Sequence, residues 1–199
     1  MPAVEPPAGQ PFILFISGSS ASGKTTLYDS LQADPSLAHL RFHDIDENGV
    51  PPVGRGPWRQ FRVEELLYEA TEALREGVST VICGISKPHE VIESAYFDPG
   101  DRIHFLVLEI PFATLEERIR QRVADQAAQV AFDECFNPGA MAEFLLASRN
   151  LQRELRNAVS QQRRGHLLEV ADLTPVEMHR VVVALIRQIA GAPAPAVAG

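Results

Sequence analysis

The 199-residue chain contains very little cysteine, and it lacks long apolar runs. Its two cysteines, Cys83 and Cys135, are too few for a disulfide framework and do not have the spacing of a metal site. No apolar run approaches the ~18 residues that a membrane-spanning helix requires. The first residues lack the charged-then-apolar layout of a signal peptide. We therefore expect a cytoplasmic protein with reduced thiols and no membrane partner.

Clustered positive charge is also missing. The chain carries 18 basic and 26 acidic side chains, for a net charge of −8, and no stripe of lysine or arginine. This balance disfavours nucleic acid as a partner. The length and the 45% apolar content fit a single domain, which we expect at residues 12–190. Proline, alanine and glycine dominate residues 1–11 and 191–199, which we predict to be flexible tails.

The most informative part of the sequence is a glycine-rich segment near the N-terminus. Residues 18–25 read Gly-Ser-Ser-Ala-Ser-Gly-Lys-Thr and match the phosphate-binding pattern G-x-x-x-x-G-K-[ST], the Walker A motif. An apolar run at residues 12–16 leads into it, as expected for a strand that is covered on both faces. Residues 25–31 can continue as a helix, with Leu27 and Leu31 on one side. Strand, glycine loop and helix are the context that the motif requires.

This loop predicts a binding site for the phosphates of a nucleotide. Its backbone N–H groups can converge on phosphate at the N-terminus of the helix, where the helix dipole adds positive charge. Lys24 is expected to reach the β- and γ-phosphates, and Thr25 to bind Mg²⁺ through its hydroxyl. Lys24 is one of only two lysines beside 16 arginines, and a compact ammonium suits a tight phosphate cradle better than a planar guanidinium. The predicted nucleotide-binding residues are Gly18, Ser19, Ser20, Ala21, Ser22, Gly23, Lys24, Thr25 and Thr26.

Short strands alternate with helices along the rest of the chain. We predict further strands at 40–46, 78–83, 102–110 and 166–170, and helices at 61–76, 88–96, 114–127, 140–162 and 175–189. Residues 48–57 are predicted to be a loop, and capping boxes are predicted at Thr114–Glu117 and Thr174–Glu177. This order predicts an α/β fold, a three-layer α/β/α arrangement around a five-stranded parallel sheet. The site is expected at the carboxyl ends of the strands.

A pair of acids follows the second predicted strand. Asp44 and Asp46 are two residues apart, so they share a face if the strand stays straight and diverge if the chain turns there. Near a γ-phosphate, one carboxylate can support Mg²⁺ and the other can accept a proton from an attacking hydroxyl. The alternative is a solvated acidic turn without a catalytic role.

Together, residues 18–27 and 42–46 resemble the shikimate/gluconate-kinase and nucleoside-monophosphate-kinase branch of P-loop proteins. The resemblance implies a P-loop kinase-like fold and transfer of phosphate from Mg-ATP to a small molecule. It implies that Asp44 supports the metal and that Asp46 contacts the acceptor. Residues 115–122 resemble the helix that leads into the mobile lid of these kinases, which places a lid or insert at about 118–150. Residues 173–175 stand where the family cups adenine.

The chain departs from this family at two places. The third predicted strand ends in Cys83-Gly84-Ile85-Ser86, without the acid of a Walker B motif, which counts against a motor or switch ATPase. Gly84 alone stands where shikimate kinases have a glycine cluster, so shikimate is a poor candidate for the acceptor.

Residues after Asp46 are candidates for the acceptor site. Arg59 and Arg62 could clamp a carboxylate or phosphate, and Trp58 could stack on a sugar or ring. The alternative is an exposed helix start with Trp58 packed on the sheet. Arg118 is a catalytic candidate that could neutralise charge on the γ-phosphate; its alternative role is pairing with a neighbouring acid.

The resulting hypothesis is an ATP- and Mg²⁺-dependent small-molecule kinase, with Lys24, Asp46, Asp44 and Arg118 as catalytic residues. The acceptor is left open among sugar acids, nucleosides, nucleotides and aminoglycoside-like or phenolic compounds, and the protein is expected to be a monomer or homodimer. The alternative is a nucleotide-binding switch, because Asp46-Glu47-Asn48-Gly49 fits the D-x-x-G of GTPases. However, no N-K-x-D guanine motif is present.

Overall fold

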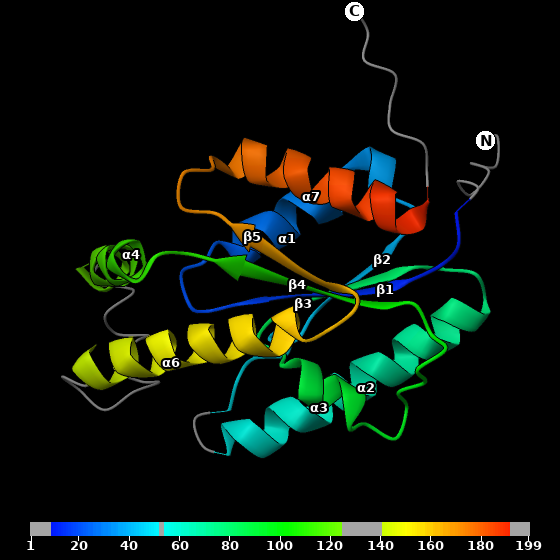
Figure 1. Ribbon diagram of the computed structural model, residues 1–199, viewed down its shortest axis with the longest axis horizontal. Coiled ribbons are helices and arrows are strands. Elements are labelled where there is room, and N and C mark those ends of the chain that lie inside the picture. The colour runs from blue at the N-terminus through cyan, green and yellow to red at the C-terminus, as the bar shows by residue number, and fades with distance from the viewer. Residues whose placement is uncertain (1–8, 52–53, 125–140, 192–199) are drawn as a thin grey trace, which may run out of the picture.

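A five-stranded parallel sheet forms the centre of the molecule (Figure 1). The computed structural model describes residues 9–51, 54–124 and 141–191. The strand order is β2-β3-β1-β4-β5, and every neighbouring pair is parallel. The strands are β1 Ile13–Gly18, β2 Arg41–Asp44, β3 Thr80–Cys83, β4 Ile103–Glu109 and β5 Gly165–Glu169. The predicted parallel α/β sheet is therefore confirmed.

Helices cover both faces of this sheet (Figure 1). One face carries α1 Lys24–Gln32 and α7 Pro175–Ala190, and the other carries α2 Arg55–Arg75, α3 Pro88–Ile92 and α6 Met141–Ser160. A short 3₁₀ helix, η1, spans Pro35–Leu37. Helix α4, Phe112–Ala124, lies beyond the carboxyl end of β4. The predicted three-layer arrangement is thus observed.

The central strand β1 is buried on both faces, as its wholly apolar sequence predicts. Leu14 and Ile16 point into the core under α1 and α7, whereas Ile13 and Phe15 point into the core under α2, α3 and α6. Because successive side chains of a strand alternate between faces, one short strand anchors both layers. This anchoring fixes the position of the loop that follows Gly18.

Helix α2 begins at Arg55 rather than at Phe61, so the predicted loop is wrong at residues 55–57. Pro57 falls within the first turn of the helix, where backbone N–H groups have no partner inside the helix and proline is tolerated. Phe61, the first residue of the predicted helix, is 64% exposed. Because α2 begins early, Trp58 and Arg59 belong to the same regular helix as Arg62.

The two predicted capping boxes have opposite outcomes. At α7, the Thr174 hydroxyl accepts from the Glu177 N–H at 3.3 Å and the Glu177 carboxylate accepts from the Thr174 N–H at 2.8 Å, which confirms the prediction. Helix α4 instead begins at Phe112, and the Leu115 N–H already donates to Pro111 O at 2.9 Å. Thr114 therefore lies inside the helix, and the cap predicted there is wrong.

Several predicted segments fall outside the described residues. Residues 1–8 and 192–199 of the predicted tails and residues 125–140 of the predicted lid belong to this group. The described parts of the predicted lid are helical, in the last turns of α4 and the first turns of α6. Across the described ranges, no helix is both long and apolar enough to cross a membrane.

Candidate functional site: a phosphate loop facing a pair of acids

The glycine-rich loop connects the end of β1 to the start of α1 and depends on two glycines. A Cβ at Gly18 would lie 2.6 Å from Ser22 Oγ and 2.9 Å from Leu108 O, so no larger residue fits there. Gly23 is the N-cap of α1 and has φ of 93°, in the left-handed region that glycine adopts at low cost. The two fixed glycines of the motif are therefore required for different reasons, Gly18 by steric crowding and Gly23 by its backbone conformation.

Lys24 is held at the centre of this loop. Its ammonium donates to Gly18 O at 2.8 Å and to Ser19 O at 2.7 Å. Burial lowers the pKa of Lys24, while the nearby Cys83, Asp46 and Asp44 act in the opposite direction. A half-buried ammonium that is bound by carbonyls of its own loop can exchange these partners for other oxygens, including those of phosphate.

Cys83 lies directly behind the lysine, at the end of β3. Its thiol donates to Lys24 O at 3.7 Å and is buried. Burial raises the pKa of Cys83 to about 12, so the group is a neutral thiol at physiological pH. Cys83 therefore serves packing rather than nucleophilic chemistry.

A cavity of about 500 Å³ opens in front of the loop. One wall consists of loop and α1 residues, and the others come from distant parts of the chain. Its lining residues are Ser20, Ala21, Ser22, Gly23, Lys24, Thr25, Thr26, Asp46, Ile85, Arg118, Arg122, Val170, Leu173, Pro175 and Met178. Gly18 and Ser19, predicted to contact nucleotide, lie behind this wall: Gly18 is buried, and the Ser19 hydroxyl donates to Gln152 Oε1 of α6 at 3.2 Å.

The two acids diverge because the chain turns after β2, which is one of the two expected outcomes. The backbone N–H of the buried Ile45 donates to Cys83 O at 2.8 Å, and the Asp46 N–H donates to Asp44 Oδ1 at 2.9 Å. Asp46 lines the cavity, whereas Asp44 stabilises the turn that presents it. Burial raises the pKa of Asp46, as does the neighbouring Asp44, while Lys24 and Arg59 oppose the shift.

The donor set near the loop fits Mg²⁺ that arrives with a nucleotide. Thr25 and Asp46 offer a hydroxyl and a carboxylate to the same cavity. Within the described ranges, no group of three or more His, Cys, Asp or Glu side chains forms a complete metal site. Mg²⁺ commonly takes one or two protein ligands and completes its shell with phosphate oxygens and water. Thr25 and an acid of the turn would hold the ion in this way.

The arginines of α4 face different directions. Arg118 and Arg122 line the cavity, and Arg118 donates to Ala171 O at 3.4 Å. Arg120 instead pairs with Glu116 at 2.7 Å on the exposed side of the helix. Because residues four apart share one helical face, Arg118 and Arg122 are brought together. The resemblance left open which arginines of residues 115–122 act in the lid, and Arg118, the catalytic candidate, is one of the two that line the cavity.

The remaining wall is apolar. Val170, Leu173, Pro175 and Met178 line it, at the end of β5 and the start of α7. Residues 173–175 were expected near adenine through the family resemblance. Val170 and Met178 were missed by the sequence analysis, although Met178 lies one turn after Pro175 and its face of α7 could have been inferred.

The three acceptor candidates on α2 do not line the cavity. Trp58 packs against the core under α2, α3 and α6. Arg59 donates through Nε at 3.1 Å and Nη2 at 2.7 Å to Glu90 Oε1, and Arg62 pairs with Glu65 one turn along the helix. The acids that bind these arginines were not anticipated. Glu90 in particular is 31 residues from Arg59, and no local pattern links them.

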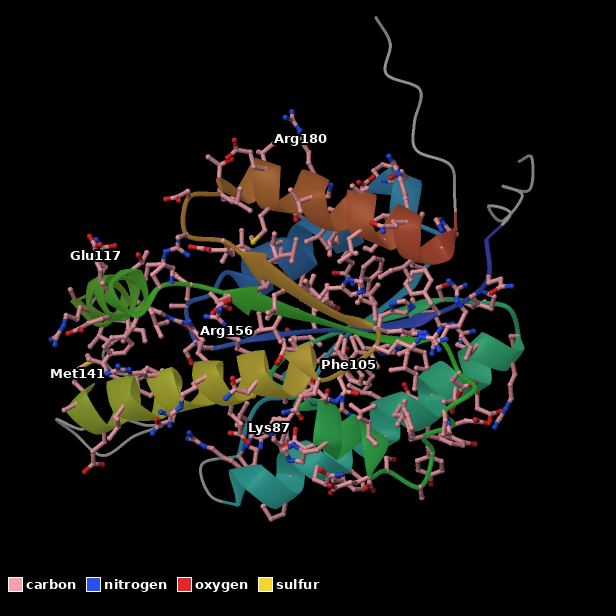
Figure 2. The ribbon with its side chains drawn as sticks, in the orientation of Figure 1. Lys87, Phe105, Glu117, Met141, Arg156 and Arg180 are labelled. Atoms are coloured by element: carbon pink, nitrogen blue, oxygen red, sulfur yellow. The ribbon has the colours of Figure 1, made fainter. Side chains whose placement is uncertain are left out.

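Lys87, the second lysine, is also paired. It lies beside α6 (Figure 2), and its ammonium is 2.8 Å from Glu154 Oε1 of that helix. This ion pair joins the segment after β3 to α6. It was missed for the same reason as the Arg59–Glu90 pair, because both depend on how distant helices pack.

Comparison with known proteins identifies the fold. No protein-family model and no curated protein sequence matches the chain. Solved structures that resemble it include a sugar kinase from Janibacter sp. HTCC2649, with a TM-score of 0.57 and 20% identity over 92% of this chain and 99% of that one. A gluconokinase from Sinorhizobium meliloti 1021 gives 0.56 and 20% over 92% and 95%. Shikimate kinase from Aquifex aeolicus vf5 gives 0.51 and 18% over 92% and 100%. At these identities the likeness establishes a shared fold.

Proposed function

We propose that this chain, which has the fold of P-loop small-molecule kinases, transfers the γ-phosphoryl group of Mg-ATP to a hydroxyl of a small acceptor. The observation that carries the proposal is the placement of Lys24 and Asp46 on one cavity, where a half-buried ammonium and a carboxylate line space that a triphosphate can fill. Neither group alone would distinguish a kinase from a nucleotide-binding protein. A cation for phosphate and a base for an acceptor are the two functions that phosphoryl transfer needs.

The loop supports the nucleotide half of this reaction. Phosphate oxygens would replace Gly18 O and Ser19 O as partners of Lys24, and the backbone N–H groups at the start of α1 would bind the same phosphates. The apolar wall around Leu173 and Met178 would cover the base. Magnesium bound with the nucleotide would neutralise charge on the β- and γ-phosphates.

Asp46 supports the acceptor half. In the proposed step, the acceptor oxygen forms a bond to the γ-phosphorus while the bond to the β,γ-bridging oxygen breaks, and the electron pair leaves with ADP. Asp46 takes the hydroxyl proton. Partial desolvation and the neighbouring Asp44 raise the pKa of this carboxyl, and a raised pKa makes the carboxylate a better proton acceptor. Asp44 would orient Asp46 through its bond to the Asp46 N–H.

Arg118 and Arg122 would supply further positive charge as the phosphoryl group moves. Both line the cavity from α4, and Arg118 would exchange its bond to Ala171 O for a phosphate oxygen. Charge stabilisation of this kind is a major part of catalysis in phosphoryl transfer.

The proposal is tested by ATP consumption with and without a library of hydroxyl-bearing metabolites. A kinase is stimulated by particular compounds and forms a phosphorylated product in equal amount to ADP. Lys24→Met is expected to lower the stimulated turnover by at least about 10²-fold, and its unchanged melting temperature would show that the fold is intact. Slow turnover that no compound alters would favour a nucleotide switch instead.

A further inference from the structure

We propose that the acceptor is a polyhydroxylated compound that is neutral or carries an amino group, and not a carboxylate or a phosphate ester. The inference rests on the proposed kinase function and concerns the chemistry of the acceptor end. The cavity has a nucleotide end at the phosphate loop and an acceptor end at Asp46. The inference depends on which cations near the acceptor end are already paired with acids of the protein.

Strand order separates the two ends. Asp46 follows β2, at one edge of the sheet, and Ile85 follows the adjacent β3. Arg118 belongs to α4, which follows β4, and it contacts Ala171 just after β5 at the opposite edge. The phosphate loop follows the central strand β1 and lies between them. An acceptor that reaches Asp46 therefore meets the β2–β3 side of the cavity, whereas Arg118 and Arg122 line it from α4.

Arg59 is the arginine whose charge acts on Asp46, and it is already paired with a carboxylate of the protein. Both its Nε and Nη2 donate to Glu90 Oε1, at 3.1 and 2.7 Å. The other oxygen of Glu90 accepts from the Lys87 N–H at 2.8 Å, and Glu90 is only 7% exposed. An anionic ligand that displaced Glu90 from Arg59 would leave a buried carboxylate without its partner, which is costly.

The other cations of this region are paired as well. Lys87 lies 2.8 Å from Glu154, and Arg62 pairs with Glu65. Arg62 has a side chain only 11% exposed, so it is largely withdrawn from ligand. Arg59, Arg62 and Lys87 are thus each matched by a carboxylate of the protein, and Arg55, at the start of α2, donates through Nε to the Pro51 carbonyl at 3.2 Å.

The acids of the turn remain as the groups that an acceptor meets. Asp46 lines the cavity, and Asp44 is bound to its backbone. Carboxylates accept hydrogen bonds from hydroxyl and ammonium groups and repel carboxylate and phosphate. A hydroxyl is also the group from which Asp46 would take a proton. The acceptor end therefore selects against the anions that Arg59 and Arg62 were expected to clamp.

Matched compounds provide the test. One set has a single six-carbon chain with three different ends: gluconate, glucitol and 1-amino-1-deoxyglucitol. Parallel sets compare a cyclic polyol with its carboxylate and amine, and ribose with ribose 5-phosphate. In whichever set supports turnover, the neutral or amino member is expected to exceed the anionic member in kcat/KM by at least about ten-fold, a difference of ~1.4 kcal/mol.

A preference for the anionic member would overturn this inference while leaving the kinase function in place. Absence of stimulated turnover in every set, with Mg-ATP binding retained, would overturn the kinase function and this inference with it. The two failures are thus distinguished by whether any phosphorylated product forms.

Glu90→Gln tests whether the Arg59–Glu90 pair is what disfavours anionic acceptors. Glu93→Gln is the control, since Glu93 lies at the end of the same short segment, at the C-cap of α3. Loss of the Glu90 charge releases Arg59, and the anionic-to-neutral ratio of kcat/KM is expected to rise about ten-fold. Glu93→Gln should leave the ratio unchanged. A folded Glu90→Gln protein with the wild-type ratio would contradict the inference.

Discussion

The two ends of the cavity are built in different ways. At the end that we propose binds the nucleotide, the residues that line the cavity are mostly consecutive, from Ser20 to Thr26, and their backbone supplies the geometry. At the acceptor end, Asp46 and Ile85 follow separate strands. Nearby, Arg59 and Arg62 form ion pairs with Glu90 and Glu65. A consecutive site can be identified from its sequence, whereas a dispersed one depends on the packing of α2, α3 and α6.

The difference also concerns charge. Positive groups at the nucleotide end, Lys24, Arg118 and Arg122, face the cavity. Positive groups at the acceptor end, such as Arg59 and Lys87, are bound to acids. The first arrangement is suited to a polyanion, and the second leaves hydrogen-bond acceptors for a hydroxyl. Variants that affect one end without the other test this contrast.

The largest effect is expected at the acceptor end, from Asp46→Asn. The amide cannot accept the hydroxyl proton, so kcat should fall by about 10²–10⁴-fold, the usual contribution of a general base. In the absence of Mg²⁺, the Kd for ATP should change by less than about three-fold, because Asp46 is not part of the loop. Stopped-flow turnover and calorimetry measure the two quantities. A large loss of ATP affinity with normal turnover would show that the ends are not separate.

A smaller loss of turnover is expected from Arg118→Met, which removes a cavity-facing guanidinium but keeps its apolar stem. We expect kcat to fall by about 10- to 100-fold through loss of charge stabilisation. Arg120→Met is the matched control, because Arg120 lies two residues away on α4 and pairs with Glu116 on the exposed side. Equal effects of the two substitutions would argue against a specific role for Arg118.

Gly23→Ala addresses the backbone of the nucleotide end. Its φ of 93° is unfavourable for alanine, and a Cβ would lie 3.3 Å from Met178 Cε. We expect ATP affinity to fall by about ten-fold, with a cost to stability of ~1–2 kcal/mol. Gly77→Ala is the control, since Gly77 has φ of 80° with nothing within 4 Å of the added Cβ. It should lose stability similarly and keep its ATP affinity.

The features that could be predicted from the sequence belong mainly to the nucleotide end and the sheet. The parallel sheet, the phosphate loop and the cap of α7 depend on local patterns, namely an apolar strand, two required glycines and a Thr-Pro-Val-Glu segment. The divergence of Asp44 and Asp46 was left open, because it depends on a turn fixed by the backbone bond from Ile45 to Cys83.

The acceptor candidates show what the sequence could not supply. Arg59 has the residue type of an anion clamp, but its role is set by Glu90, which reaches it only after α3 packs against α2. Trp58 has the residue type of a stacking platform, yet it packs against the core. Residue type indicates what a side chain can bind, and tertiary packing determines what it does bind.

The smallest expected effect concerns the acid stability of the folded protein and a pair of histidines on β4 and β5. His104 of β4 and His166 of β5 stack with ring centroids 5.6 Å apart, and their Nδ1 and Nε2 atoms are 3.3 Å apart. Burial, followed by repulsion from His166, lowers the pKa of His104 to about 4. The unfolded chain therefore takes up a proton near pH 6.5, before the folded protein does.

Stability should consequently decrease as the pH falls from 6.5 towards 4, and the contribution of His104 should be absent above pH 7. His104→Leu is expected to reduce the loss of melting temperature over this range, while ATP affinity at pH 7.5 stays unchanged. Thermal unfolding at several pH values measures it. An identical acid dependence in the variant would contradict the assignment of this effect to His104.

The central claim is that the loop around Lys24 binds the triphosphate of a nucleotide with magnesium. Isothermal titration calorimetry of wild-type protein and Lys24→Met with ATP, in the presence and absence of Mg²⁺, tests it most directly. We predict saturable, magnesium-dependent binding to the wild type and a loss of at least about ten-fold in affinity for Lys24→Met. Equal affinity in the two proteins, or no magnesium-dependent binding of any nucleoside triphosphate to the wild type, would contradict the account.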